Sequence, residues 1–239
     1  MQIDNSVIVI TGASSGIGAA TARAASVRGA RVVLAARRED RITALADELA
    51  HAVAVRCDVT DRADLDSLVE RALDEFGRVD VLVNNAGQGL QATVEQIDLD
   101  DFRAVLELNL VAPLAAMQAV LPAMRRQKAG AIVNVSSGTT FGDVPGTGGY
   151  VASKIALERL SAIARNELDG TGITVSTVIP FATSTEFLTS IRAGRADAEA
   201  MTSGADFDTP DQVADAVLHL VESGEARLDL VPAAYGGSR

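Results

Sequence analysis

The segment that most restricts the fold of this chain lies near its N-terminus, where an apolar run leads into a glycine-rich turn and then into a helix. Residues 7–10 (VIVI) form a short, continuous apolar run, as expected of a strand that is buried on both faces. Residues 11–18 (TGASSGIG) follow, and a helix-forming stretch continues to Ala25. Strand, glycine-rich turn and helix in this order are the context that a phosphate-binding loop requires.

The three glycines of this turn have separate expected roles in binding a dinucleotide. Gly12 permits the tight turn, Gly16 lets the backbone approach the phosphates, and Gly18 lets the helix pack close to the strand. N–H groups at the helix N-terminus carry partial positive charge and attract a pyrophosphate. The spacing is Gly-x-x-x-Gly-x-Gly with no Lys-Ser/Thr after it, so the turn is not a nucleoside-triphosphate loop. A glycine turn without a ligand is the alternative.

Beyond this unit, the chain alternates between apolar runs typical of strands and stretches typical of helices. We expect strands at 6–11, 31–36, 52–57, 80–84, 130–136, 173–179 and 228–232, and helices near 17–28, 39–50, 61–76, 99–127, 149–169 and 210–223. This alternation predicts an α/β fold with one doubly wound parallel sheet, helices on both faces and right-handed crossovers. No linker or repeat divides residues 1–239, so we expect one domain with its ligands at the carboxyl ends of the strands.

Tyr150 and Lys154 are the most specific candidates for chemistry. The chain has only two tyrosines and two lysines, and this pair stands four residues apart, on one face of a predicted helix. A nearby ammonium favours the phenolate, so we expect the pKa of Tyr150 to fall from about 10 towards neutrality. A phenol of that acidity suits general acid-base catalysis. A surface tyrosine stacked on a lysine stem is the alternative.

Composition excludes several other classes of protein. Hydrophobic residues make up 48% of the chain and charged residues 22%, as in an ordinary soluble globular protein. The net charge of −11 argues against a nucleic acid or an anionic membrane as partner. We find no secretory signal and no apolar run of membrane-span length, and the lone Cys57 fits a reducing cytoplasm. His51 and His219 are isolated, so we expect no metal site.

With these motifs, the chain resembles the short-chain dehydrogenase/reductase family from Val7 to about Pro232. Further landmarks of that family occur in the expected order: Asp58 after the third strand, Asn84-Asn85-Ala86-Gly87 after the fourth, Asn109 in a helix, and Ser136-Ser137 after the fifth. The resemblance implies a Rossmann-type fold and a nicotinamide-dependent enzyme that interconverts carbonyls and alcohols.

The resemblance also implies a catalytic tetrad of Asn109, Ser137, Tyr150 and Lys154. Tyr150 would protonate the forming alkoxide in reduction and accept the proton in oxidation. Lys154 would lower the pKa of Tyr150 and hydrogen-bond the nicotinamide ribose, while Ser137 would donate to the substrate oxygen. Asn109 would hold a water that connects Lys154 to solvent. Two alternatives stay open: Ser136 in place of Ser137, and an Asn109 that only satisfies backbone groups in a disturbed helix.

Two arginines decide the expected cofactor. An NAD site requires an acid near the end of the second strand, whereas the 2′-phosphate of NADP requires an arginine. Arg37 and Arg38 follow that strand, so we predict NADP (NADPH) rather than NAD, with Arg37 as the main ligand of the phosphate. A solvated helix start, in which Arg38 pairs with Glu39 or Asp40, is the alternative. By resemblance, the cofactor-binding residues are Gly12, Ser14, Ser15, Gly16, Ile17, Gly18, Arg37, Arg38, Asp58, Val59, Asn85, Ala86, Gly87, Tyr150, Lys154, Pro180, Thr183 and Thr185.

The chain departs from the family after the sixth strand, where Phe181 stands in place of the usual glycine. Its ring either narrows the substrate entrance or packs against a lid, and the sequence leaves both open. Residues 184–208 interrupt the alternation and are predicted to form that lid. Arg192 and Arg195 in the lid are interpreted as solvated, with recognition of a carboxylate or a carrier phosphate as the alternative.

The predicted substrate is a small to medium ketone, aldehyde, alcohol or hydroxy acid, because residues 138–148 and the lid contribute mostly small or apolar side chains. Alternative functions are a 3-oxoacyl (acyl-carrier) reductase and a non-catalytic NADP-sensing regulator on the same fold. By resemblance we expect a cytoplasmic homodimer or homotetramer, assembled through the helices near 99–127 and 149–169.

Overall fold

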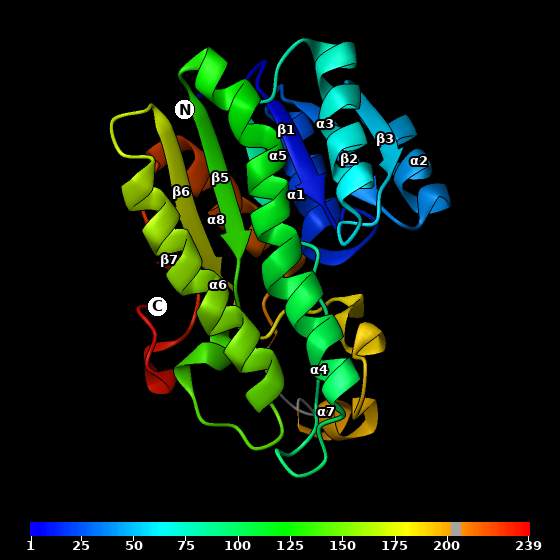
Figure 1. Ribbon diagram of the computed structural model, residues 1–239, viewed down its shortest axis with the longest axis vertical. Coiled ribbons are helices and arrows are strands. Elements are labelled where there is room, and N and C mark those ends of the chain that lie inside the picture. The colour runs from blue at the N-terminus through cyan, green and yellow to red at the C-terminus, as the bar shows by residue number, and fades with distance from the viewer. Residues whose placement is uncertain (202–206) are drawn as a thin grey trace.

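The computed structural model describes residues 1–201 and 207–239, apart from the side chains of Ala200 and Met201. In these residues, seven parallel strands form one sheet in the order β3-β2-β1-β4-β5-β6-β7 (Figure 1). The strands are β1 (Val7–Thr11), β2 (Arg31–Ala36), β3 (Ala52–Arg56), β4 (Val81–Asn84), β5 (Gly130–Val135), β6 (Ile173–Ile179) and β7 (Arg227–Asp229). The predicted doubly wound parallel sheet is therefore confirmed.

Helices cover both faces of this sheet, because side chains of successive strand residues point to opposite faces. Ile8 and Ile10 of β1 belong to the core under α1, α2 and α8, whereas Val7 and Val9 belong to the core under α3, α5 and part of α6. Figure 1 shows α5 and α6 in front of the sheet and α1 and α8 behind it. The helices are α1 (Gly16–Val27), α2 (Glu39–Glu48), α3 (Arg62–Phe76), α4 (Leu99–Leu106), α5 (Ala112–Gln127), α6 (Gly148–Glu167), α7 (Arg195–Met201) and α8 (Pro210–Ser223).

Two elements differ from the sequence-based expectation. The helix predicted over 99–127 is divided by a π-helical turn, η1 (Glu107–Val111), between α4 and α5. The last strand ends at Asp229, earlier than the predicted 232. Leu230 still donates to the carbonyl of Ile179 on β6 at 2.9 Å, and the chain then turns at Pro232, which has no N–H to donate, into the short 3₁₀ helix η4 (Ala233–Tyr235).

The stretch Leu99–Gln127 is also long and apolar enough, by length and composition, to cross a membrane, which the sequence analysis did not foresee. A single stretch of this kind, 29 residues long with 39% of its apolar window buried, is weak evidence for a membrane span, because helices of soluble proteins reach the same length and apolarity. Ala116, Met117 and Val120 of α5 pack into the core against the sheet. Leu99, Val111 and Leu114 of this stretch are exposed.

Candidate active site

The carboxyl ends of the strands meet at one edge of the sheet and border a cleft of about 920 Å³. This is where open α/β sheets bind their ligands. Of the site residues predicted from the sequence, all except Gly18 and Asn109 line this cleft. The structure therefore brings together segments that are far apart in the chain, from Gly12 of the glycine-rich turn to Thr185.

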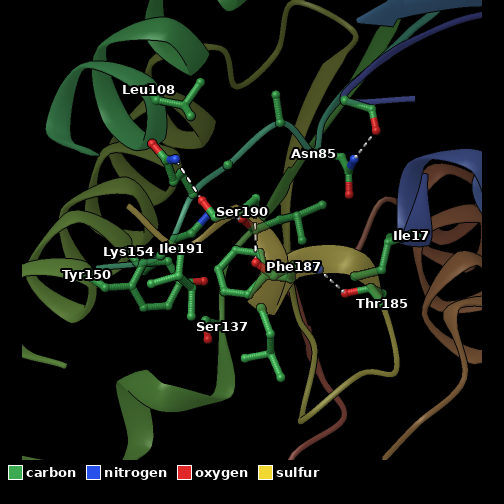
Figure 2. Close-up of a pocket in the computed structure, with 18 of the residues that line it drawn as sticks. Ile17, Asn85, Leu108, Ser137, Tyr150, Lys154, Thr185, Phe187, Ser190 and Ile191 are labelled. Atoms are coloured by element: carbon green, nitrogen blue, oxygen red, sulfur yellow. Dashed lines mark hydrogen bonds between the residues drawn. The ribbon is translucent and has the colours of Figure 1, made fainter. Parts of the chain in front are cut away.

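The glycine-rich turn is shaped so closely that side chains would not fit in it. Gly12 has a φ of +65°, and a Cβ built there would lie 2.9 Å from the Cα of Ala86. A Cβ at Gly18 would lie 2.5 Å from the carbonyl oxygen of Gly12. Gly18 does not line the cleft, but its lack of a side chain lets α1 pack against the turn. Asn85 holds the turn in place, because its side-chain amide donates to the carbonyls of Thr11 (3.0 Å) and Gly12 (3.2 Å) (Figure 2).

The first turn of α1 leaves its N–H groups available to an anion. Ser15, at the N-cap, makes no side-chain capping hydrogen bond, and no acidic residue lies in this turn. Uncapped N–H groups at a helix N-terminus attract phosphate. Together with the glycine cradle, this end of the cleft fits the pyrophosphate of a dinucleotide.

Arg37 and Arg38 lie at the same end of the cleft but differ in their hydrogen bonds and ion pairs. Arg38 donates to the hydroxyls of Ser14 (2.8 and 3.0 Å) and Ser15 (2.7 Å), and pairs with Glu186 at 2.9 Å. Its partner is thus Glu186, not the Glu39 or Asp40 of the sequence-based alternative. Arg37 is exposed and makes no hydrogen bond or ion pair within the described part of the chain.

Asp58 borders the cleft after β3. Burial disfavours its charge, but hydrogen bonds from Thr60 and the nearby charges of Arg37 and Arg56 outweigh this, so the pKa of its carboxyl lies below the ordinary value. Asp58 therefore contributes a negative charge to the lining of the cleft.

Tyr150 and Lys154 both lie on the buried face of α6, with 8% and 4% of their surfaces exposed. The ammonium of Lys154 lies 5.9 Å from the centre of the Tyr150 ring and donates to the carbonyl of Val135 at 2.9 Å. Figure 2 shows both side chains directed into the cleft beside Ser137.

The pKa of Tyr150 corrects the sequence-based expectation. Burial raises the pKa of the phenol to about 12, and a hydrogen bond with Ser137 opposes this only in part. Burial also lowers the pKa of Lys154 to about 8, against the charge of Glu158, which raises it. Spacing alone suggested that the ammonium would make the phenol more acidic. Burial of the phenol determines its pKa here, because the charged form loses its solvation.

The two serines after β5 point to different partners. Ser137 borders the cleft and shares a hydrogen bond of 2.9 Å with the hydroxyl of Thr139. Ser136 is 4% exposed, and its hydroxyl donates to Glu158 on α6 at 2.6 Å. Of these two serines, Ser137 is the one whose hydrogen bond acts on the Tyr150 phenol. The geometry favours Ser137 as the residue that meets a substrate.

Asn109 lies in the π-helical turn and is completely buried. Its side-chain oxygen accepts from the backbone N–H of Gln88 (2.9 Å), and its amide donates to the carbonyl of Gln88 (2.9 Å) and to the hydroxyl of Ser153 (3.0 Å). Asn109 thus ties the loop after β4 to α6 and lies behind the cleft. Asn109 therefore does satisfy backbone groups, as in the structural alternative that the sequence left open.

The segment predicted as a lid lies over the substrate end of the cleft. It contains η3 (Glu186–Ser190) and α7, while residues 202–206 of the predicted range lie outside the described residues. Phe187 of η3 packs against Tyr150, with ring centres 5.7 Å apart (Figure 2). Arg192 pairs with Asp101, and Arg195 with Glu199, both at 2.6 Å.

Several residues of the site carry no local sequence signal. Gln88 joins the lid to the tetrad, because its amide donates to the carbonyl of Ser190 at 2.7 Å while its backbone binds Asn109. Ser153 links Asn109 to the carbonyl of Tyr150. Tyr235, from the C-terminal segment, reaches the cleft and stacks on Phe181, with ring centres 5.1 Å apart. Position within the Tyr-x-x-x-Lys motif could have identified Ser153, whereas the others depend on tertiary contacts.

Comparisons with known proteins agree with this geometry. The profile described as short chain dehydrogenase matches residues 6–196, which is most of the chain. The protein belongs to the short-chain dehydrogenase family. An uncharacterized oxidoreductase from Listeria monocytogenes is 35% identical to it over 236 residues, covering 94% of each chain. Another, from Staphylococcus saprophyticus, is 38% identical over 189 residues and 77% of each chain.

Solved structures of this family have the same fold as this short-chain dehydrogenase. A family member from Burkholderia phymatum in complex with NAD has a TM-score of 0.91 and 26% identity, covering 99% of this chain and 92% of its own. An alcohol dehydrogenase from Thermococcus sibiricus, complexed with 5-hydroxy-NADP, has a TM-score of 0.82 and 29% identity, covering 95% and 96%. The protein is therefore an oxidoreductase with the nucleotide-binding fold of its family, acting on CH–OH groups.

Proposed function

We propose that this short-chain dehydrogenase uses NADP(H) to interconvert a ketone or aldehyde with its alcohol, with Tyr150 as the general acid and base. The observation that carries this proposal is the arrangement of Ser137, Tyr150 and Lys154 at one end of the cleft that begins at the glycine-rich turn. A bound nicotinamide supplies or accepts the hydride. The protein's contribution is to hold the carbonyl, move its proton and balance its charge.

Each member of the tetrad has a distinct part in this proposal. Tyr150 gives its proton to the forming alkoxide in reduction, and its high pKa keeps that proton available throughout the ordinary pH range. The Ser137 hydroxyl donates to the same oxygen as negative charge develops there. Lys154, held by the Val135 carbonyl, places a positive charge beside the phenol. Asn109 and Ser153 position α6 against the loop after β4.

The preference for NADP rests on Arg37. It is exposed directly after β2, lines the cleft and makes no hydrogen bond or ion pair with the described residues, so its planar guanidinium is available for a 2′-phosphate. Arg38 is already engaged with Ser14, Ser15 and Glu186, so it contributes second to Arg37. No acid stands at the end of β2, where NAD sites place one.

A panel of carbonyl compounds, followed at the absorbance of NADPH, tests the function. We expect turnover by the wild-type protein and a loss of at least about 100-fold in kcat for Tyr150→Phe, since general acid catalysis contributes roughly that much. Undiminished activity of Tyr150→Phe would remove this residue as the proton donor. Binding of NADPH without turnover of any carbonyl would instead favour the nucleotide-sensing regulator.

The preference for NADP over NAD is tested separately with Arg37→Ala. The control is Arg56→Ala, which removes an arginine from the neighbouring strand β3. We expect Arg37→Ala to raise the KM for NADPH by roughly tenfold and to leave the KM for NADH nearly unchanged, because a charge-assisted contact to phosphate is lost. An NADP/NAD preference that does not change in Arg37→Ala would defeat the assignment.

A further inference from the structure

Aromatic side chains gather at the substrate end of the cleft. The chain has six phenylalanines and two tyrosines and no tryptophan. Six of these eight side chains line the cleft, although they come from five separate segments: Phe141, Tyr150, Phe181, Phe187, Phe207 and Tyr235. The other two, Phe76 and Phe102, pack against buried clusters of the core. Tyr150 and Phe187 belong to the same cluster as Phe102, so packing accounts for these two rings. Phe141, Phe181, Phe207 and Tyr235 belong to none of the buried clusters of the described residues, so packing of the core does not account for them.

Two of these rings lie next to the residues that would meet a carbonyl, Ser137 and Tyr150. Phe187 of the lid packs against Tyr150 (Figure 2). Gly138 follows Ser137 directly and donates to the carbonyl of Pro180 at 2.7 Å, which brings Phe181 next to Gly138. Tyr235 then stacks on Phe181.

The outer part of this aromatic wall is exposed. Tyr235 is 62% exposed and Phe207 38% exposed, although both line the cleft. Apolar surface that faces a concave site gains free energy when a ligand covers it. Aromatic faces gain most from flat partners, which stack on them or meet their edges.

Positive charge at the substrate end is already neutralised or buried. Of the cationic side chains that line the cleft in the described residues, Arg37 and Arg38 lie at the opposite end, beside the glycine-rich turn. Lys154 is buried on the Val135 carbonyl, and Arg192 pairs with Asp101 at 2.6 Å. A carboxylate or phosphate entering here would lose its hydration without gaining a free cation, and that is costly.

We propose that the substrate is a neutral carbonyl compound with a flat, apolar body, an aromatic or alicyclic ketone or aldehyde, held between Phe187 and the Phe181–Tyr235 pair. This inference rests on the proposed function and narrows it, because it disfavours hydroxy acids and acyl-carrier substrates. It also assigns a role to Phe181: the ring that replaces the family's usual glycine forms one wall of the substrate site together with the C-terminal segment.

Binding is measured first, because it does not depend on turnover. Acetophenone, cyclohexanone and pyruvate are titrated by calorimetry into the wild-type protein saturated with NADP⁺. We expect acetophenone and cyclohexanone to bind at least about tenfold more tightly than pyruvate. Equal or tighter binding of pyruvate would overturn the inference. Selective binding of the neutral ketones with no turnover of any carbonyl would support the ligand class while defeating the proposed reaction.

The variant Tyr235→Ala then tests whether the aromatic wall determines selectivity for aromatic over small aliphatic ketones. The readout is the ratio of kcat/KM for acetophenone to kcat/KM for acetone, which we expect to fall roughly threefold to tenfold, the range for loss of one aromatic contact. Tyr235→Phe, which keeps the ring, should retain the wild-type ratio, and Val27→Ala, an exposed position at the far end of α1, is the control. An unchanged ratio in both Tyr235→Ala and Phe181→Leu would overturn the assignment of this wall.

Discussion

At the scale of single residues, two adjacent serines provide the sharpest test of the site. We expect Ser137→Ala to lower kcat by about 100-fold, because a donor to the developing negative charge is lost. Ser136→Ala should cost about 1–3 kcal/mol of stability instead, because the Glu158 carboxylate loses the hydroxyl that donates to it. Carbonyl reduction and thermal unfolding of both variants separate the two effects. A larger loss of activity in Ser136→Ala would reverse the assignment.

The pH dependence of reduction should report Lys154 and not Tyr150. Lys154, whose pKa burial lowers to about 8, carries its charge below that pH and loses it above. Tyr150, whose pKa is raised to about 12, keeps its proton over the same range. Because the ammonium stabilises the forming alkoxide, we expect kcat/KM for carbonyl reduction to fall above about pH 8, by about tenfold per pH unit.

Lys154→Arg identifies the group that titrates in this profile. Arginine stays protonated at every accessible pH, so the variant should be less active overall but should lack the decline above about pH 8. A decline at the same pH in this variant would assign it to Tyr150. The direction of the Tyr150 shift could not be predicted from the sequence, because the i, i+4 spacing shows that the two groups are neighbours but not that both are buried.

At the scale of elements, the lid is fastened to the cofactor end of the cleft by one carboxylate. Glu186 of η3 receives hydrogen bonds from Arg38 (2.9 Å) and Arg41 (2.7 and 2.9 Å), both near the start of α2. An exposed ion pair contributes about 0.2–1 kcal/mol, so Glu186→Gln should loosen the lid without unfolding the protein. We expect trypsin to cleave after Arg192 and Arg195 roughly twofold to fivefold faster in this variant, as measured by mass spectrometry of the fragments.

Glu48→Gln is the matched control for this prediction. Glu48 is 53% exposed, close to the 47% of Glu186, and pairs with Arg23 between α1 and α2, away from the lid. It should leave cleavage in the lid unchanged. Equal cleavage of wild-type protein and Glu186→Gln would show that the carboxylate does not hold the lid.

The elements also show what local sequence patterns can and cannot predict. The strands and helices around the glycine-rich turn follow from apolar periodicity, because burial on the sheet imposes that periodicity. A disturbed helix at Asn109 was left open as an alternative, but its π-helical form and its partner could not be predicted, since the Asn109 side chain binds both backbone groups of Gln88, a tertiary contact. The place of the C-terminal segment beside Phe181 was missed for the same reason.

At the scale of the whole molecule, one apolar surface has no partner in the chain. The helices near 99–127 and 149–169, through which we expect assembly, are rich in apolar residues, and the core takes up part of them, because Met117 and Leu157 are buried. Leu114 and Val111 at the start of α5 remain 36% and 42% exposed. On α6, Ile155 and Ile163 remain 50% and 42% exposed. Figure 1 shows these two helices on the same face of the sheet.

We expect this face to be covered by a second copy of the chain, since aliphatic side chains on two helices of one face are typical of interfaces between identical subunits. The double variant Leu114→Glu/Ile163→Glu should be monomeric at micromolar concentration in light scattering, whereas the wild-type protein should be a dimer or tetramer. Val94→Glu, at an 89% exposed position in the loop before α4, is the control and should keep the wild-type mass. A monomeric wild-type protein would contradict the assembly, and binding of wild-type protein to lipid vesicles that the double variant loses would assign the same apolar helices to a membrane surface.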